Sequence, residues 1–208
     1  MAMQIYAVVN QKGGVGKSAI ADSIALELAK GGARVLLADL DTIQKSSFEW
    51  YENRQDKMEN LVVKVFKGVK DVANFATSKK GFDYLVVDGA AHASEDTLNI
   101  SAVAHRIFIP TGSALSDLKP SARLALEMIR KGVDPKRIRM VLSKISTESE
   151  ALTAKLALEE QGLKVFGHLL RQSPGYILSL DAGRGLQESN YPTLRAHAQT
   201  LISALIKK

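Results

Sequence analysis

The sequence predicts an α/β fold, a doubly wound and mostly parallel sheet of seven to eight strands with helices on both faces. Two observations lead to this fold class. Short apolar runs alternate with amphipathic stretches of helical period along the chain, as in sheets built from repeated strand–helix units. A glycine-rich segment also lies between the first apolar run and the first helical stretch, which is the order of a strand–loop–helix phosphate site.

The alternation assigns each element in turn. We expect strands over residues 4–9, 34–39, 61–66, 83–88, 106–110, 138–143 and 165–168. We expect helices over residues 17–30, 44–55, 69–78, 95–103, 117–131, 149–161 and 192–206. The first helix places Ile20, Ile24 and Leu28 on one face, and Gly31-Gly32 ends it. No linker, repeat or low-complexity segment interrupts the pattern, so residues 1–208 are expected to form one domain.

Composition restricts the function classes. Apolar residues make up 46% and charged residues 24% of the 208 residues, as in ordinary soluble domains. Cysteine is absent, which excludes a disulfide framework and thiol chemistry. No signal-peptide pattern or membrane-length apolar run is present, so a cytoplasmic location is expected. The net charge of +6 fits either a lysine-rich surface or a polyanionic partner, such as DNA or an anionic membrane.

The glycine-rich segment carries the most specific chemistry. Backbone N–H groups of such a loop wrap around phosphates, and the following helix N-terminus adds partial positive charge. Lys17 is predicted to reach the β- and γ-phosphates, and the Ser18 hydroxyl to contact Mg²⁺. Lys12 adds a second cation, which makes sense if it reaches the phosphates of a neighbouring subunit. The predicted nucleotide-binding residues are Lys12, Gly13, Gly14, Val15, Gly16, Lys17, Ser18 and Ala19.

Three aspartates follow predicted strands. Asp39 and Asp41 end the second strand, and Asp88 ends the apolar fourth strand. Ligands in doubly wound sheets bind at the carboxyl ends of the strands, so these side chains are expected beside the glycine-rich loop. Asp88 has the position of a strand-end carboxylate that is directed toward Mg²⁺, and it is expected to act through a coordinated water. Ala19 lacks the hydroxyl that many such loops carry, which predicts weaker nucleotide binding by on the order of 1 kcal/mol.

These motifs resemble the deviant Walker-A ATPases related to the partition protein ParA and the cell-division protein MinD. The resemblance rests on Lys12–Ser18, Asp39-Leu40-Asp41 and Leu85–Gly89, and it extends in order and length over nearly the whole chain. The short chain is most similar to small ParA proteins that lack an N-terminal helix-turn-helix domain.

The resemblance implies an ATPase that uses ATP and Mg²⁺, with weak intrinsic activity. It implies that Asp41 orients the attacking water, and that Asp39 lies near the Mg²⁺ that Ser18 and Asp88 help to hold. Lys12, Lys17 and Asp41 would then be catalytic. It further implies an ATP-dependent homodimer that binds DNA non-specifically at the nucleoid, and a ParB-like or adaptor protein that stimulates hydrolysis.

Some segments depart from the family pattern or stay open. Thr42-Ile43 stands where relatives commonly have Pro-Gln, which predicts a longer or reshaped loop after Asp41. The loop over residues 109–117 is expected at the dimer face, although Asp117 fits the N-cap of the next helix equally well. The resemblance places the adenine between Ser143-Lys144 and 171–174. His92 is expected to be a polar loop residue rather than a catalytic one.

Basic residues gather in two parts of the chain. Residues 130–139 hold five of them, and the C-terminal part holds Arg171, Arg184 and Arg195. The resemblance favours these last three as contacts to DNA phosphates, and such contacts are sequence-independent and salt-sensitive.

Two other functions account for parts of the sequence. The last helix carries an apolar stripe, which fits either packing against the sheet or a MinD-like membrane helix. Packing is favoured because the polar face of this helix has little basic character before Lys207, so membrane binding is not expected. A metabolic relative that carries a metal cluster is disfavoured by the absence of cysteine, and synthetase chemistry by the absence of a substrate domain.

Overall fold

The computed structural model describes residues 2–91 and 95–207. Its strands are β1 (Gln4–Val8), β2 (Val35–Asp39), β3 (Leu61–Val65), β4 (Tyr84–Asp88), β5 (Arg106–Thr111), β6 (Ile138–Ile145) and β7 (Leu170–Arg171). Its α-helices are α1 (Lys17–Lys30), α2 (Ser46–Asn53), α3 (Val69–Lys79), α4 (Glu95–Val103), α5 (Leu115–Arg130), α6 (Glu148–Glu159), α7 (Pro174–Asp181) and α8 (Pro192–Ile206). Two short 3-10 helices, η1 (Pro135–Arg137) and η2 (Leu186–Glu188), complete the described elements.

The strands form one parallel sheet in the order β3-β2-β4-β1-β5-β6-β7. The predicted doubly wound fold is therefore confirmed. The sequence of β2, VLLAD, is buried throughout, as expected for a parallel strand that helices cover on both faces. The strand order changes direction around β1, and the glycine-rich loop leaves the carboxyl end of that strand.

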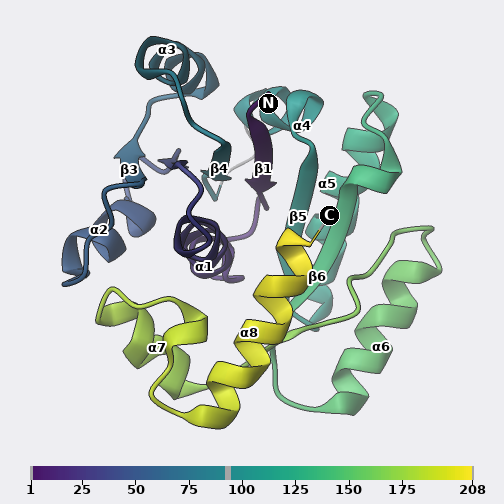
Figure 1. Ribbon diagram of the computed structural model, residues 1–208. Coiled ribbons are helices and arrows are strands. Elements are labelled where there is room, and N and C mark those ends of the chain that lie inside the picture. The colour runs from purple at the N-terminus through teal and green to yellow at the C-terminus, as the bar shows by residue number, and fades with distance from the viewer. Residues whose placement is uncertain (1, 92–94, 208) are drawn as a thin grey trace.

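Helices cover both faces of the sheet, as Figure 1 shows. The core on one face contains buried residues of α1, α7 and α8 together with Trp50 of α2. The core on the other face contains buried residues of α3, α4, α5 and α6. Helices α1, α5 and α8 each bury several apolar residues, which is the arrangement that stabilises an open α/β sheet.

Helix α8 packs inside this arrangement. Ala198, Leu201, Ile202 and Leu205 are at most 1% exposed and belong to the same core as α1. The interpretation of the stripe as packing against the body of the protein is thus confirmed. None of the helices in the described part of the chain has the length and apolar character needed to cross a membrane.

Three element predictions were wrong. The seventh strand is Leu170–Arg171 rather than 165–168, because Val165 makes only a single bridge to Met140 and the ladder resumes after a bulge in β6. Helix α5 begins at Leu115, so Ala114 and not Asp117 is its N-cap. Helix α7 was not predicted, although its Ser173 N-cap, which accepts a hydrogen bond from the Gly175 N–H, and Pro174 are typical start signals.

Candidate nucleotide-binding site

The glycine-rich loop has the backbone of a phosphate cradle. Gly14 and Gly16 have φ values of +75° and +90°, a conformation that side chains with a Cβ rarely adopt. Successive N–H groups of such a turn point to one side and form an anion-binding concavity. A Cβ on Gly16 would lie 2.7 Å from Ser143 Oγ. The loop therefore needs glycine at this position for its conformation and for its contact with β6.

Lys17 begins α1, and its side chain is buried in the concave side of the loop. The residue is 8% exposed, and its Nζ donates a hydrogen bond to the Lys12 carbonyl at 3.1 Å. Burial lowers the pKa of the Lys17 ammonium, whereas the charges of Asp88 and Asp41 raise it. An ammonium that is largely desolvated and close to carboxylates is well placed to take up phosphate charge.

Lys12 points in a different direction from Lys17. Its Nζ lies 3.6 Å from Asp117 Oδ1, and 43% of its side chain is exposed. Asn10 fixes the start of the loop, because its side chain accepts from the Lys12 N–H and donates to the Pro110 carbonyl. The two lysines of the motif therefore occupy different places, one inside the loop and one on its surface toward α5.

Asp39 and Asp88 lie side by side, as predicted from their strand ends. They are paired in the register of β2 and β4. Asp39 is fully buried, and its carboxylate accepts hydrogen bonds from the N–H groups of Asp41, Ser47 and Phe48 at 2.9–3.2 Å. Burial raises its pKa and these N–H groups lower it. Asp39 thus holds the first turn of α2 in place.

Of the two carboxylates, that of Asp88 is the more available to bind a cation. Its Oδ2 accepts the Ser47 hydroxyl at 3.0 Å, whereas its Oδ1 is buried and has no hydrogen-bond partner. Burial raises the pKa of Asp88 to about 7, even though the Ser18 and Ser47 hydroxyls and Lys17 lower it. A buried carboxylate oxygen without a partner is costly, and a bound cation would supply that partner.

These residues fit Mg²⁺ as part of a nucleotide complex. Within residues 2–91 and 95–207, no three His, Cys, Asp or Glu side chains form a metal site by themselves. Mg²⁺ in proteins usually takes one or two carboxylates together with waters and substrate phosphates. Ser18 and Asp88 would hold the ion. Asp39 would lie behind them because its oxygens already accept three N–H groups.

Two buried residues beside Asp88 were missed by the sequence reasoning. Asp22 is 2% exposed, its Oδ1 has no partner, and burial raises its pKa well above the ordinary value. Asp22 follows Ser18 by four residues on α1, so both side chains lie on the same face of the helix. This spacing could have identified Asp22 from the sequence. Ser47 is fully buried between Asp39 and Asp88, and nothing in its local sequence indicates that role.

Asp41 lies just beyond β2 and organises the departing loop. Its Oδ1 accepts the N–H groups of Ile43 and Gln44 at 3.2 and 2.9 Å. Ile43 is 79% exposed, so the Thr42-Ile43 pair lies on the surface. The carboxylate of Asp41 is near enough to Lys17 to influence its pKa, which places all three predicted catalytic residues around one loop.

The remaining predicted positions are dispersed. Ser143 lies against Gly16 and its Oγ has no partner, whereas Lys144 is exposed. Arg171 pairs with Glu148, and Arg184 donates to Asn190 Oδ1 at 2.6 Å. No hydrogen bond or ion pair in the described part of the chain joins Arg171, Arg184 and Arg195, which is exposed on α8. His92 lies outside the described residues.

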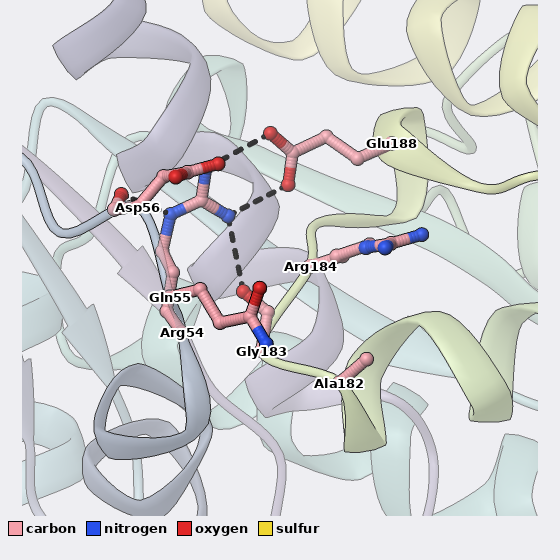
Figure 2. Close-up of a pocket in the computed structure, with 7 residues that line it drawn as sticks. All are labelled: Arg54, Gln55, Asp56, Ala182, Gly183, Arg184 and Glu188. Carbon is pink, nitrogen blue, oxygen red and sulfur yellow. Dashed lines mark hydrogen bonds and ion pairs between the residues drawn. The ribbon is translucent and has the colours of Figure 1, made fainter.

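A separate cavity of about 300 Å³ lies between the end of α2 and the segment before η2 (Figure 2). Arg54 forms two hydrogen bonds to the Glu188 carboxylate, at 2.7 and 3.0 Å, and a third to the Gly183 carbonyl. The dashed lines in Figure 2 mark these contacts. Because both charged groups are paired, we interpret this cluster as a structural clamp.

The strand–loop–helix cradle, the buried lysine and the strand-end carboxylates define a P-loop nucleotide-binding protein. Residues 6–184 match the model of the CobQ/CobB/MinD/ParA nucleotide-binding domain. The chain belongs to this family, which confirms the resemblance to ParA and MinD proteins. Proteins of the ParA/MinD type are P-loop ATPases.

Similar proteins include a chromosome-partitioning ATPase and a protein that maintains carboxysome distribution. The chain is 29% identical to the chromosome-partitioning ATPase Soj of Thermus thermophilus over 164 residues, which are 65% of this chain and 66% of Soj. It is 28% identical to the maintenance of carboxysome distribution protein A of Gloeobacter kilaueensis, over 81% of this chain and 76% of that protein.

Solved structures share the fold. An ATP complex of McdA from Cyanothece superposes with a TM-score of 0.72 at 18% identity, over 99% of this chain and 98% of McdA. MinD of Pyrococcus horikoshii with Mg-ADP superposes with a TM-score of 0.74 at 16% identity, over 98% of this chain and 95% of MinD.

Proposed function

We propose that this protein is a ParA-like positioning ATPase that switches between an ATP-bound dimer and ADP-bound monomers. The observation that carries the proposal is the separation of the two motif lysines. Lys17 is buried in the loop, whereas Lys12 is 43% exposed on its surface, and the one ion pair of Lys12 among the described residues is the 3.6 Å contact with Asp117. A half-exposed cation at the edge of a phosphate site is free to reach the nucleotide of a second subunit.

Each residue has a separate role in the proposed reaction. Lys17 neutralises charge on the β- and γ-phosphates, and the loop N–H groups orient them. Ser18 and Asp88 would hold Mg²⁺, which when bound would supply further charge neutralisation. Asp41, which is only partly buried, orients the water that attacks the γ-phosphate. Because phosphoryl transfer depends mainly on positioning and charge, the addition of Lys12 from the second subunit couples hydrolysis to dimerisation.

Replacement of Lys12 by alanine tests the two-subunit site. The Lys12→Ala variant should bind ATP within about threefold of the wild type, because Lys17 and the loop N–H groups remain. Its turnover should fall roughly a hundredfold or more, since one charge-stabilising group is lost. Nucleotide binding by fluorescence and phosphate release measure the two effects. An unchanged turnover number would reject the two-subunit site.

The proposed platform for the dimer is non-specific DNA, with release when a partner protein stimulates hydrolysis. The net charge of +6 and the similarity to Soj support DNA. The test measures binding of a fluorescent duplex by the Asp41→Ala variant, with ATP and with ADP, at two salt concentrations. ATP-dependent binding that weakens steeply with salt is expected.

The alternative platform is a membrane, as for a MinD-like switch, and the shared fold with MinD supports it. The apolar stripe of α8 is buried against the protein core, so this helix would have to detach before it could bind lipid. If the ATP-bound protein ignores DNA but sediments with anionic liposomes, the membrane function replaces the DNA function.

A further inference from the structure

A cationic pocket lies at the end of the sheet opposite the phosphate loop. Its cavity, of about 380 Å³, is formed where the first residues of β5 and β6 meet the end of α8. In Figure 1 the last turn of α8 ends beside these two strands. The basic side chains that line the pocket are Arg106, Lys136, Arg137, Arg139 and Lys207, and no Asp or Glu of the described residues lines it.

The strand register brings two of these cations together. Arg106 is opposite Tyr6 of β1, and Arg139 is opposite Phe108, which follows Arg106 by two residues on β5. Arg106 and Arg139 therefore lie on the same face of neighbouring strands. Like charges in such positions repel each other. Burial lowers the pKa of Arg139, and the charge of Arg106 lowers it further.

Neutral groups hold the guanidinium groups in place. Arg106 donates to the Leu205 carbonyl at 2.6 Å and lies over the Tyr6 ring, 5.3 Å from its centroid. Arg139 donates to the carbonyls of Lys136 and Ile138 at 2.6 and 2.8 Å. Carbonyls and rings fix the positions of these groups without cancelling their charge. Each guanidinium has five N–H donors, so several remain for a ligand.

The cations of the pocket are unpaired across residues 2–91 and 95–207, since none of them forms an ion pair there. The carboxylate of the nearby Asp134 accepts the backbone N–H of Lys136 and forms no ion pair among the described residues. Elsewhere in the protein Arg54 and Arg171 each pair with a glutamate. The pocket thus keeps repelling charges close together, and a bound anion would relieve that repulsion.

We propose that this cationic pocket binds a phosphate group, at a site separate from the nucleotide in the phosphate loop. Planar guanidinium groups match the oxygens of phosphate in pairs, and Lys136 and Lys207 add charge at the rim. A free phosphorylated solute and a phosphate of the DNA backbone offer this same chemistry. The proposal extends beyond the ATPase cycle, which uses the opposite end of the sheet.

The test titrates inorganic phosphate into protein that is saturated with Mg–ATPγS, so that the phosphate loop is occupied, and follows ³¹P NMR line widths. A parallel titration uses a fluorescent DNA duplex. The variants are Arg139→Gln and Lys136→Gln. The side chain of Lys136 is exposed and makes no hydrogen bond within the described part of the chain, so its replacement should not disturb folding. The exposed Lys70→Gln on α3 is the charge-matched control.

Each pocket variant should weaken phosphate binding roughly tenfold, the expected loss for one charge-assisted hydrogen bond, whereas Lys70→Gln should not. If affinity for the duplex falls in parallel, the DNA backbone is the source of the phosphate. If only phosphate binding falls, a free solute is the source. If both variants bind both probes like the wild type, the proposal is overturned. The phosphate titration requires neither hydrolysis nor dimerisation, so its result is independent of the proposed function.

Discussion

The buried carboxyl of Asp88 makes the free energy of unfolding depend on pH, and a substitution at this one residue can test that dependence. The folded protein keeps a proton on this carboxyl up to about pH 7, whereas an unfolded aspartate releases it near pH 4. The folded state therefore binds more protons between these values, and its free energy of unfolding falls as pH rises through this window. Above about pH 7 the dependence due to Asp88 ends.

Asp88→Asn should reduce this loss of stability in the nucleotide-free protein. Between about pH 5 and 7, the free energy of unfolding in urea should fall by about 2 kcal/mol less in the variant than in the wild type. Some dependence should remain, because the pKa of Asp22 is raised as well. The exposed Asp71→Asn should behave like the wild type. Equal slopes for wild type and Asp88→Asn would contradict the burial argument.

The loop glycines allow a second test at the scale of residues. Gly16→Ala forces a positive φ on a residue with a Cβ, at a cost of roughly 1–2 kcal/mol, and it creates the 2.7 Å contact with Ser143 Oγ. Binding of ADP, measured by calorimetry, should be lost. Gly132→Ala is the matched control, because Gly132 has φ +91° and an added Cβ would meet no described atom within 4 Å apart from its chain neighbours. It should lose stability but keep ADP affinity.

At the scale of elements, the Arg54–Glu188 pair joins the end of α2 to η2. Burial alone would raise the pKa of Glu188, but the hydrogen bonds from Arg54 and Lys30 lower it to about 2. The pair therefore stabilises the fold above about pH 4.5 and loses this effect as the pH falls toward 2. Ser47 in the first turn of α2 contacts both strand-end carboxylates, so the clamp also supports the site.

Breaking this clamp should destabilise the protein strongly. Arg54→Met leaves Glu188 buried without its main partner and should cost roughly 3 kcal/mol in chemical denaturation at neutral pH. The double variant with Glu188→Met should recover part of this loss, because neither charge is then left unpaired. A single variant within ~0.5 kcal/mol of the wild type would show that the pair adds little to stability.

At the scale of the whole molecule, the sheet places the candidate nucleotide-binding residues at one end and the cationic pocket at the other. A face-to-face dimer through the phosphate loops would bring two Lys12 side chains to two nucleotides. Light scattering should therefore give a dimer for Asp41→Ala with Mg–ATP and a monomer with Mg–ADP. Addition of Lys12→Ala to this variant should weaken the dimer. A monomer in both nucleotide states would exclude the shared site.

The sequence alone predicted the fold class and the core of the candidate site. Apolar runs of strand length separated by helical periods leave few alternatives to a doubly wound sheet. Asp39 and Asp88 could be placed together because the carboxyl ends of neighbouring parallel strands meet at one edge. The start of α5 and the position of β7 could not be predicted, because a bulge in β6 and the contacts of neighbouring segments determine them.

The tertiary structure alone decided the contacts between distant segments. Arg54 and Glu188 are 134 residues apart in sequence, and Ser47 reaches Asp88 only because β2 and β4 are neighbours in the sheet. The sequence also could not tell paired cations from unpaired ones. Arg171 has a glutamate partner, whereas Arg106 and Arg139 lie side by side through the strand register. The local sequence determines the backbone conformation of each segment and the charges that it carries. The register of the sheet determines which of these charges lie next to each other.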